Sequence, residues 1–252
     1  MKEWLTGRNP AYEVLRAKRR QPFRLWLAQG VHEKGRLAEI VEICAARRIP
    51  VEQVERARLD ALSSSHQGVA LEVSGYPYST LADIFDRATQ QNEPPFILIL
   101  DTLQDPQNLG TLLRTAEAFG IHGVLLPFHR TATITPAVVH ASSGASEHLL
   151  VTQLNLAQAI AELKDAGVWV IGLEGSPLAQ TPEELRLNGP LALVVGSEGE
   201  GMRQLVRQSC DVLLRLPMHG HIESLNAAVA GSIALYLAWQ SRRMVDINRS
   251  YH

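Results

Sequence analysis

The stretch LALVVGSEGEGM, residues 191–202, gives the clearest indication of the fold. Five consecutive apolar residues, Leu191–Val195, lead into a turn that holds Gly196, Gly199 and Gly201, and a helical pattern begins near Met202. A short run that is apolar throughout is typical of a strand buried on both faces of a parallel sheet. We therefore expect a central strand here, with the glycine-rich turn at its carboxyl end.

Similar apolar runs recur on both sides of this stretch and alternate with helical patterns. The further strand-like runs are Phe96–Leu100, Gly123–Pro127, His148–Val151, Val168–Leu173 and Val212–Leu216. The helical patterns are Leu109–Phe119, Leu156–Ala166, Met202–Gln208 and a final long one, Leu225–Gln240. This alternation predicts an α/β fold with a mostly parallel sheet that is covered on both faces. Ligands of such folds bind beyond the carboxyl ends of the strands, where this sequence concentrates Gly, Asn, Ser and Glu.

The front of the chain has a less regular order of strand-like and helical patterns, and we expect it to form a smaller α/β unit. Its strand-like runs are Phe23–Ala28 and Gly68–Val73, and its helical patterns are Ala11–Ala17 and Leu37–Arg47. Residues 76–95 carry Pro77, a polar QQNE run and the pair Pro94-Pro95, which favour a connector with one helix in it. We place the domains at 1–75 and 96–252, with residues 76–95 as the linker.

The composition of the chain favours a globular protein and argues against several other classes. Hydrophobic residues make up 46% and charged residues 20% of the chain, which favours a packed core over disorder. No apolar run approaches the length of a membrane span, and the first ten residues lack the apolar stretch of a secretory signal, so we expect a cytoplasmic protein without a membrane partner. Cys44 and Cys210 have no neighbours at metal-ligand spacing, which indicates structural thiols and no metal site.

The charge of the chain is distributed unevenly. The net charge is −2, but residues 1–75 hold 13 Lys and Arg against 9 Asp and Glu, whereas the remainder holds 11 against 17. A mildly basic front unit could hold a polyanion, although so small an excess does not establish one.

The first motif, DPQNLGTLLRTA at residues 105–116, follows the strand-like run that ends at Leu100. Asp105 can cap a helix whose first residue is Pro106. Leu109, Leu112, Leu113, Ala116 and Phe119 would then form a core stripe, from which Arg114 lies apart. Taken alone, the motif fits a capped helix with a solvated arginine better than it fits a functional site.

The second motif is the glycine-rich turn itself. Its spacing, G-x-x-G-x-G, is neither the dinucleotide fingerprint nor a P-loop, which counts against a nicotinamide-dependent oxidoreductase. Glu198 and Glu200 would repel phosphate, so the turn suits a ligand that is not an anion. A plain tight connection between strand and helix is the alternative.

The third motif runs from Leu216-Pro217-Met218 through His219 and His221 to Ser224-Leu225-Asn226. Ser224 could cap the final helix. The small residues at the start of that helix, among them Ala227, Ala228 and Gly231, permit close packing against a neighbour in this chain or in a second copy. The two histidines suggest a metal pair only weakly, because no third ligand is evident.

In this order, the motifs N-x-G-x-x-x-R-x-A, G-x-E-G-x-G-M and P-M…S-L-N resemble those of the SpoU (TrmH-type) branch of the SPOUT methyltransferases, over residues 96–243. The whole chain looks most like the RlmB-type members, which methylate a guanosine ribose in large-subunit (23S) ribosomal RNA. The front unit, which ends His66-Gln-Gly-Val, resembles the L30e-like RNA-binding domain of these members.

The resemblance implies an AdoMet-dependent RNA 2′-O-ribose methyltransferase with S-adenosylmethionine as cofactor. It implies a SPOUT α/β-knot domain with a deep trefoil knot, and a homodimer with active sites at its interface. By position it assigns the catalytic set Asn108, Arg114, Glu198, Ser224 and Asn226. It assigns cofactor binding to Gly196, Leu216 and Leu225, with Gly172, Leu173, Pro217 and Met218 lining the same pocket. Ala227 and Ala228 depart from many relatives, which have a β-branched residue and then Ser.

The resemblance also leads to expectations about the reaction and about how the RNA is selected. We expect Arg114 to hold an RNA phosphate and to lower the hydroxyl pKa, because a guanidinium hardly deprotonates. We expect the front domain to select the RNA by shape and by exposed bases. Transfer RNA as substrate, or a non-catalytic RNA-binding assembly factor, are the alternatives.

Overall fold

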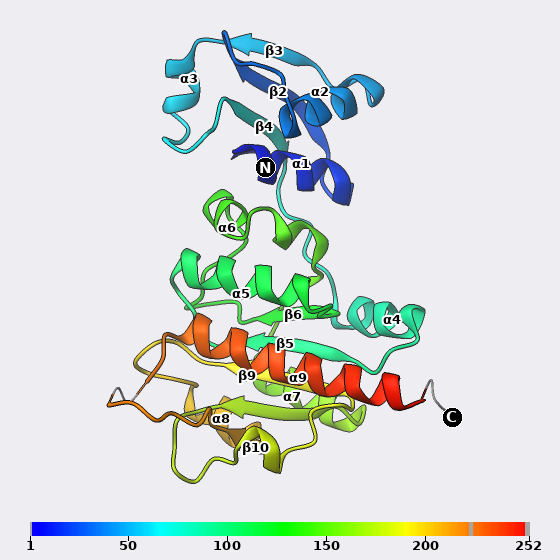
Figure 1. Cartoon of the computed structure of the whole chain (residues 1–252), viewed down its shortest axis with the longest axis vertical. Coiled ribbons are helices and arrows are strands. Elements are labelled where there is room, and N and C mark those ends of the chain that lie inside the picture. The colour runs from blue at the N-terminus through cyan, green and yellow to red at the C-terminus, as the bar shows by residue number, and fades with distance from the viewer. Residues whose placement is uncertain (1, 222–223, 250–252) are drawn as a thin grey trace. The chain divides into compact units, whose positions relative to one another are not determined.

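The computed structural model of the chain describes residues 2–221 and 224–249. The chain forms two compact units (Figure 1). The first comprises the chain up to Pro77 together with Ile134–His148, and the second comprises Tyr78–Thr133 and the chain from Leu149 onward. The units therefore differ from the contiguous domains expected from the sequence, because residues 134–148 leave the second unit and pack with the first.

The second unit is built on one six-stranded sheet in which every pairing is parallel. Its strands are β5 (Phe96–Leu100), β6 (Gly123–Leu126), β7 (Val151–Gln153), β8 (Trp169–Leu173), β9 (Leu191–Val195) and β10 (Val212–Leu214). They lie in the order β10-β8-β9-β5-β6-β7. The predicted parallel α/β fold is confirmed. One predicted strand is displaced: β7 begins at Val151, whereas His148 ends a 3-10 helix.

Helices cover both faces of this sheet. They are α4 (Leu81–Gln91), α5 (Pro106–Ala118), α7 (Leu156–Asp165), α8 (Gln204–Ser209) and α9 (Ala227–Arg249). One core cluster joins Ile97, Ile99 and Val194 of the strands to side chains of α4, α7 and α8. Because strand side chains alternate between faces, the other face is left for α5 and α9. Helix α4 lies in the predicted linker, but its Ile84 is fully buried in that core, so residues 81–91 are part of the second unit.

Helix α9 approaches the sheet and α5 closely at Gly231. A Cβ atom at this position would lie 2.7 Å from Leu112 Cδ2 and 3.1 Å from Val195 Cγ2. Glycine is therefore needed here for helix α9 to reach this depth. Gly231 therefore serves packing within the chain itself.

The first unit has a four-stranded mixed sheet in the order β1-β4-β2-β3. Its strands are β1 (Lys2–Thr6), β2 (Pro22–Ala28), β3 (Val51–Val54) and β4 (Val69–Ser74). Its helices are α1 (Arg8–Ala17), α2 (Arg36–Ala46), α3 (Arg56–Asp60), α6 (Pro136–Ala141) and the 3-10 helix η1 (Ala145–His148). Sequence patterns identified β2, β4, α1 and α2 but missed the short β1, β3, α3 and α6, whose apolar periods are too brief to stand out.

The returning segment 134–148 is held in the first unit by a buried ionic network. Arg20 donates from Nε and Nη2 to the two carboxylate oxygens of Glu147, at 2.9 and 3.0 Å, and from Nη1 to Glu3 at 2.8 Å. Arg20 is 3% exposed and Glu147 is 0% exposed. The Tyr76 hydroxyl donates to the Ser146 carbonyl at 3.0 Å, which ties the same segment to the end of the first unit.

Candidate functional site

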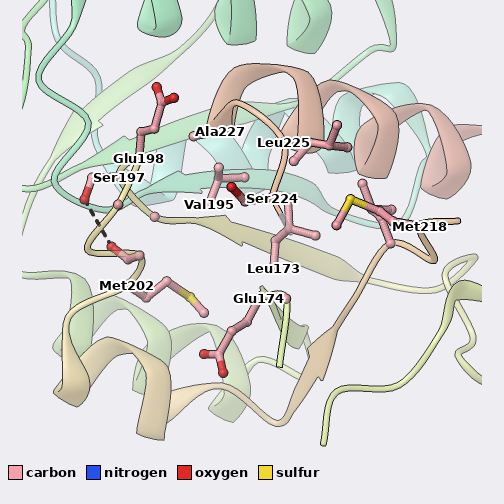
Figure 2. A pocket seen from close by; sticks show the side chains of 16 residues that line it. Leu173, Glu174, Val195, Ser197, Glu198, Met202, Met218, Ser224, Leu225 and Ala227 are labelled. Carbon is pink, nitrogen blue, oxygen red and sulfur yellow. Dashed lines mark hydrogen bonds between the residues drawn. The ribbon is translucent and has the colours of Figure 1, made fainter. Parts of the chain in front are cut away.

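A pocket opens at the carboxyl ends of β8 and β9, in the second unit. Figure 2 shows Leu173, Val195, Met218 and Leu225 converging on it from different elements, with the Ser224 hydroxyl at its edge. Its volume is about 310 Å3. This is the edge at which α/β sheets bind their ligands.

The glycine-rich turn forms one wall of the pocket and closes on itself. Ser197 and Gly201 exchange two backbone hydrogen bonds, each of 3.0 Å. A Cβ atom at Gly196 would lie 2.2 Å from the backbone carbon of Gly201, so no other residue fits without opening the turn. Gly199 and Gly201 have φ angles of +88° and +70°, which favour glycine. The turn therefore presents main-chain groups to a ligand at short range.

Asp101 fixes the far end of this turn. It lies directly after β5 and is 0% exposed. Its carboxylate accepts from the Arg203 backbone N–H at 2.7 Å and from Arg203 Nε at 2.8 Å, where helix α8 is about to begin. The turn is therefore clamped between strand β9 and a buried charge.

A polar cluster joins the three motifs beside the pocket. Asn226 Nδ2 donates to Asn108 Oδ1 at 3.1 Å and to Glu198 Oε2 at 3.0 Å. Its Oδ1 accepts from the backbone N–H groups of Ala228 and Val229, at 2.9 and 3.2 Å, and so caps helix α9. The cap fixes which end of the Asn226 amide faces the other two residues. Asn226 is therefore the N-cap of α9, a role for which Ser224 was the alternative from the sequence.

The cluster retains hydrogen-bonding capacity. Within the described part of the chain, no residue accepts from Asn108 Nδ2 or donates to Glu198 Oε1. Figure 2 shows the Glu198 carboxylate turned away from the apolar side chains of the pocket. The cluster thus offers one donor and one acceptor to a molecule that approaches next to the pocket.

The first motif forms helix α5 as predicted. The Asp105 carboxylate accepts from the backbone N–H groups of Gln107 and Asn108, at 3.2 and 3.1 Å, and Pro106 occupies the first turn. Arg114 is exposed and lies off the buried stripe. Six residues separate it from Asn108, which is roughly 9 Å along the helix and about 120° around it. Arg114 does not line the pocket of its own chain.

The residues assigned to the cofactor divide into two groups. Gly196, Leu173, Leu216, Met218 and Leu225 line the pocket, as do Glu198 and Ser224 of the catalytic set. Gly172 and Pro217 do not. A Cβ atom at Gly172 would lie 2.8 Å from Met202 Cε, so this glycine allows Met202, which does line the pocket, to pack from behind.

Sequence patterns missed several pocket residues. Glu174 lines the pocket and is held by Arg207, whose Nε and Nη2 donate to its two oxygens at 2.5 and 2.9 Å. This pairing raises the pKa of Arg207 above its ordinary value. Ala227 and Ala230 of α9 complete the wall. The sequence showed that these residues are small and begin a helix after a polar loop. That pattern indicated close packing and did not indicate a pocket.

Residues 2–221 and 224–249 hold no group of three or more His, Cys, Asp or Glu that could bind a metal ion. In the same residues, no helix is both long and apolar enough to span a bilayer.

Two family models match the chain in the order of its units. The SpoU rRNA Methylase family matches residues 95–236, and a domain described as RNA 2′-O ribose methyltransferase substrate binding matches residues 4–79. The chain belongs to the SpoU family of RNA methyltransferases. The resemblance that rested on three motifs is confirmed, as are the enzyme class and the small N-terminal domain.

Relatives and solved structures agree with this family. A Bacillus subtilis (strain 168) protein assigned to the TrmH family of tRNA/rRNA methyltransferases is 40% identical over 245 residues, 96% of this chain and 97% of that protein. The SpoU methyltransferase AviRb of Streptomyces viridochromogenes, in complex with AdoMet, has a TM-score of 0.79 at 22% identity and covers 96% of this chain and 91% of its own. An AdoMet-bound rRNA methyltransferase of Sinorhizobium meliloti has a TM-score of 0.77 at 23% identity, over 95% and 87% of the two chains. At these identities the two structures support the fold.

The pocket fits the cofactor of this family, S-adenosylmethionine. Space is open where Cβ atoms would stand at Gly175, Gly199 and Gly201, so a ligand can approach the backbone closely. The apolar walls suit an adenine ring. Glu198 at the rim suits a cationic sulfonium and disfavours a phosphate.

Proposed function

We propose that this SpoU-family enzyme methylates the ribose 2′-hydroxyl of a guanosine in large-subunit ribosomal RNA. The observation that carries the proposal is the Asn226 amide, which caps α9 and at the same time holds Asn108 and Glu198 beside the pocket. Three motifs far apart in the sequence thereby form one rigid polar cluster. A ribosomal substrate would also place the protein in the cytoplasm.

In the proposed reaction, bound S-adenosylmethionine supplies an electrophilic methyl group on its sulfonium. Main-chain groups of the Gly196 turn, Leu216 and Leu225 would hold the cofactor, and Leu173 and Met218 would pack against it, since all of them line the pocket. Asn108 Nδ2 and Glu198 Oε1 orient the ribose hydroxyl in line with the methyl group. Glu198 is the first acceptor of the hydroxyl proton as the oxygen attacks.

Arg114 would act from a second copy of the chain. Helix α9 exposes Val229, Ile233 and Tyr236, which are 46%, 40% and 44% exposed and recur at the spacing of one helix face. This apolar stripe begins beside the pocket and supports a homodimer in which the same face of both copies meets. In such a dimer, Arg114 on the outer side of α5 can hold an RNA phosphate at the partner's pocket.

The first unit would select the RNA. It has its own polar cavity, lined among others by Arg8, Arg56, Gln29 and Gln67, in which Gln67 already holds Arg8 through two hydrogen bonds. Guanidinium groups bind phosphate and amides bind base edges, so this cavity suits an exposed nucleotide of a folded RNA.

The main experiment measures transfer of a labelled methyl group to RNA. Total RNA from a strain lacking the gene is incubated with the protein, and 2′-O-methyl positions are then mapped. We expect one new position in large-subunit ribosomal RNA. A new position in transfer RNA instead would exclude the ribosomal substrate, and no new position in any RNA would exclude the reaction.

The shared site is tested by mixing two inactive variants, Arg114→Ala and Asn226→Asp. If Arg114 acts across the interface, each mixed dimer regains one intact site, and about a quarter of the wild-type activity returns in an equal mixture. Mixtures that stay inactive although mixed dimers form, as measured by mass spectrometry, would show that Arg114 acts within its own chain.

A further inference from the structure

The loop that follows β6 carries the most exposed aromatic side chain of the described residues. Phe128 is 60% exposed and is followed by His129 and Arg130, both exposed as well. Arg130 forms no ion pair with any residue that the structure describes. An exposed aromatic ring beside two exposed basic side chains is a combination that suits a nucleic acid, since the ring can stack on a base and a cation can meet the backbone.

This loop is held in a defined conformation. Thr131 Oγ1 and the Ala132 backbone N–H both donate to the Leu103 carbonyl, at 3.0 and 2.7 Å. Arg130 has a φ angle of +58°, in the left-handed region that side chains other than glycine rarely adopt. Strained residues of this kind persist where the surroundings fix them, and they concentrate at functional sites.

The sheet order puts the loop next to the polar cluster. β9 pairs with β5, and β5 pairs with β6, all in parallel, so their carboxyl ends lie along one edge (Figure 1). The Gly196 turn follows β9, and the connection from Leu103 to Asn108 follows β5. Neighbouring strands are about 4.8 Å apart, so the end of β6 lies roughly 10 Å from the end of β9. The loop is therefore close enough to contact a nucleotide that adjoins one bound at the polar cluster.

The edge formed by the carboxyl ends of the strands is acidic. A basic side chain there therefore affects how readily a polyanion can approach. Residues 76–252 hold 11 Lys and Arg against 17 Asp and Glu, and Asp105 and Glu198 both belong to this edge of the sheet. A polyanion that approaches the cluster is repelled by these carboxylates unless cations offset them. Arg130 is a cation at this edge, and its loop is tied directly to the connection that leads to Asn108.

We propose that Phe128 stacks on a base of the RNA adjoining the target nucleotide and that Arg130 binds the phosphate beside that base. The inference rests on the proposed function, because it assumes that RNA enters beside Asn108 and Glu198. Aromatic rings accept any base on their face, and a guanidinium binds phosphate. The loop thus holds the strand, whereas the first unit selects the RNA.

The stacking role is tested with Phe128→Ala and direct binding to unmodified large-subunit ribosomal RNA transcribed in vitro. We expect the Kd for this RNA to rise about tenfold, with the Kd for S-adenosylmethionine and the Tm unchanged. Phe128→Trp should retain the wild-type Kd. Leu178→Ala is the matched control, because Leu178 is 90% exposed and follows β8, on the other side of the sheet from β6.

The phosphate contact is tested by the salt dependence of the same binding. Arg130→Gln should reduce the slope of log Kd against log salt by about 1, and Arg186→Gln, at an exposed residue beyond β8, should not. An unchanged RNA Kd in Phe128→Ala, or an equal change in Leu178→Ala, would overturn the proposal. A wild-type protein that binds this RNA but transfers no methyl group would instead overturn the proposed function.

Discussion

Two polar clusters, one in each unit, differ in burial and in how many of their polar atoms are hydrogen-bonded. In the first unit, Arg20 and Glu147 form a bidentate ion pair that is almost wholly buried. In the second unit, Asn226 joins Asn108 and Glu198, but all three reach the surface and two of their polar atoms stay available. The buried pair has its charges satisfied and holds a distant segment in place. The accessible cluster is equally fixed, yet its remaining donor and acceptor face outward.

The difference shows that two properties distinguish a cluster that stabilises the fold from one that can bind a ligand. They are the burial of its side chains and the number of its polar atoms that already have hydrogen-bond partners. Burial raises the pKa of Glu147, while Arg20 opposes that rise, so the pair is stable only while both partners are present. It also means that residues 1–75 cannot be removed cleanly, because their loss would leave Glu147 without its partner. Substitutions in the Arg8 and Arg56 cavity are therefore a better test of RNA selection than truncation.

The largest expected effect breaks the buried cluster. Glu147→Gln leaves Arg20 buried with one anionic partner fewer and should lower the free energy of unfolding by about 3–5 kcal/mol. Replacing both residues, as Arg20→Met with Glu147→Leu, should recover most of this loss. Denaturant unfolding of the three proteins measures it. A single variant as stable as the wild type would mean that the pair does not hold the 134–148 segment.

The next effect is on the accessible cluster. Asn226→Asp keeps an oxygen to cap α9 but removes the amide that donates to Asn108 and Glu198. Methyl transfer should fall about 100-fold while the Tm changes little, because an Asp N-cap is as favourable as Asn. Activity assays and thermal melts on one preparation separate the two functions of this residue. Equal loss of stability and activity would show that Asn226 matters only as a cap.

Asp101 shares one property with each cluster. It is as buried as Glu147, and it adjoins the candidate site as Asn226 does. Asp101→Asn should keep the fold while weakening the Arg203 clamp on the glycine-rich turn. We expect the Kd for S-adenosylmethionine to rise by roughly tenfold, the equivalent of about 1.4 kcal/mol. Calorimetric titration measures this. An unchanged Kd would show that the turn keeps its shape without the charge.

The smallest expected effect is on the chemical reactivity of the two cysteine thiols. Burial raises the pKa of Cys44 to about 11 and that of Cys210 to about 12, from an ordinary value of 9.0. Neither thiol should react appreciably with iodoacetamide at pH 8 in the folded protein, whereas both should react after denaturation. Their contribution to stability is present below pH 9 and is lost as the pH rises through 11 to 12. Rapid labelling of the native protein at pH 8 would contradict this burial.

Much of the second unit followed from local patterns. The runs Phe96–Leu100 and Leu191–Val195 coincide with β5 and β9, because strands buried on both faces are apolar throughout. The Asp105-Pro106 start of α5 was also local, since a cap and its helix are neighbours in sequence. The N-cap of α9 could not be assigned from the sequence, because Ser224 and Asn226 are both favourable cap residues and only the folded contacts distinguish them.

Local sequence patterns were enough to predict the parallel α/β class and the positions of the three motifs, and the order of those motifs indicated the family. Only the tertiary structure decided that one amide joins those motifs, that Gly172 lies behind the pocket, and that residues 134–148 leave one unit to complete the other. The physical reason is the range of the interactions. Periodicity and capping act over a few residues, whereas the Asn226 cluster and the Arg20–Glu147 pair join residues more than 100 positions apart, which only the folded chain brings within hydrogen-bonding distance.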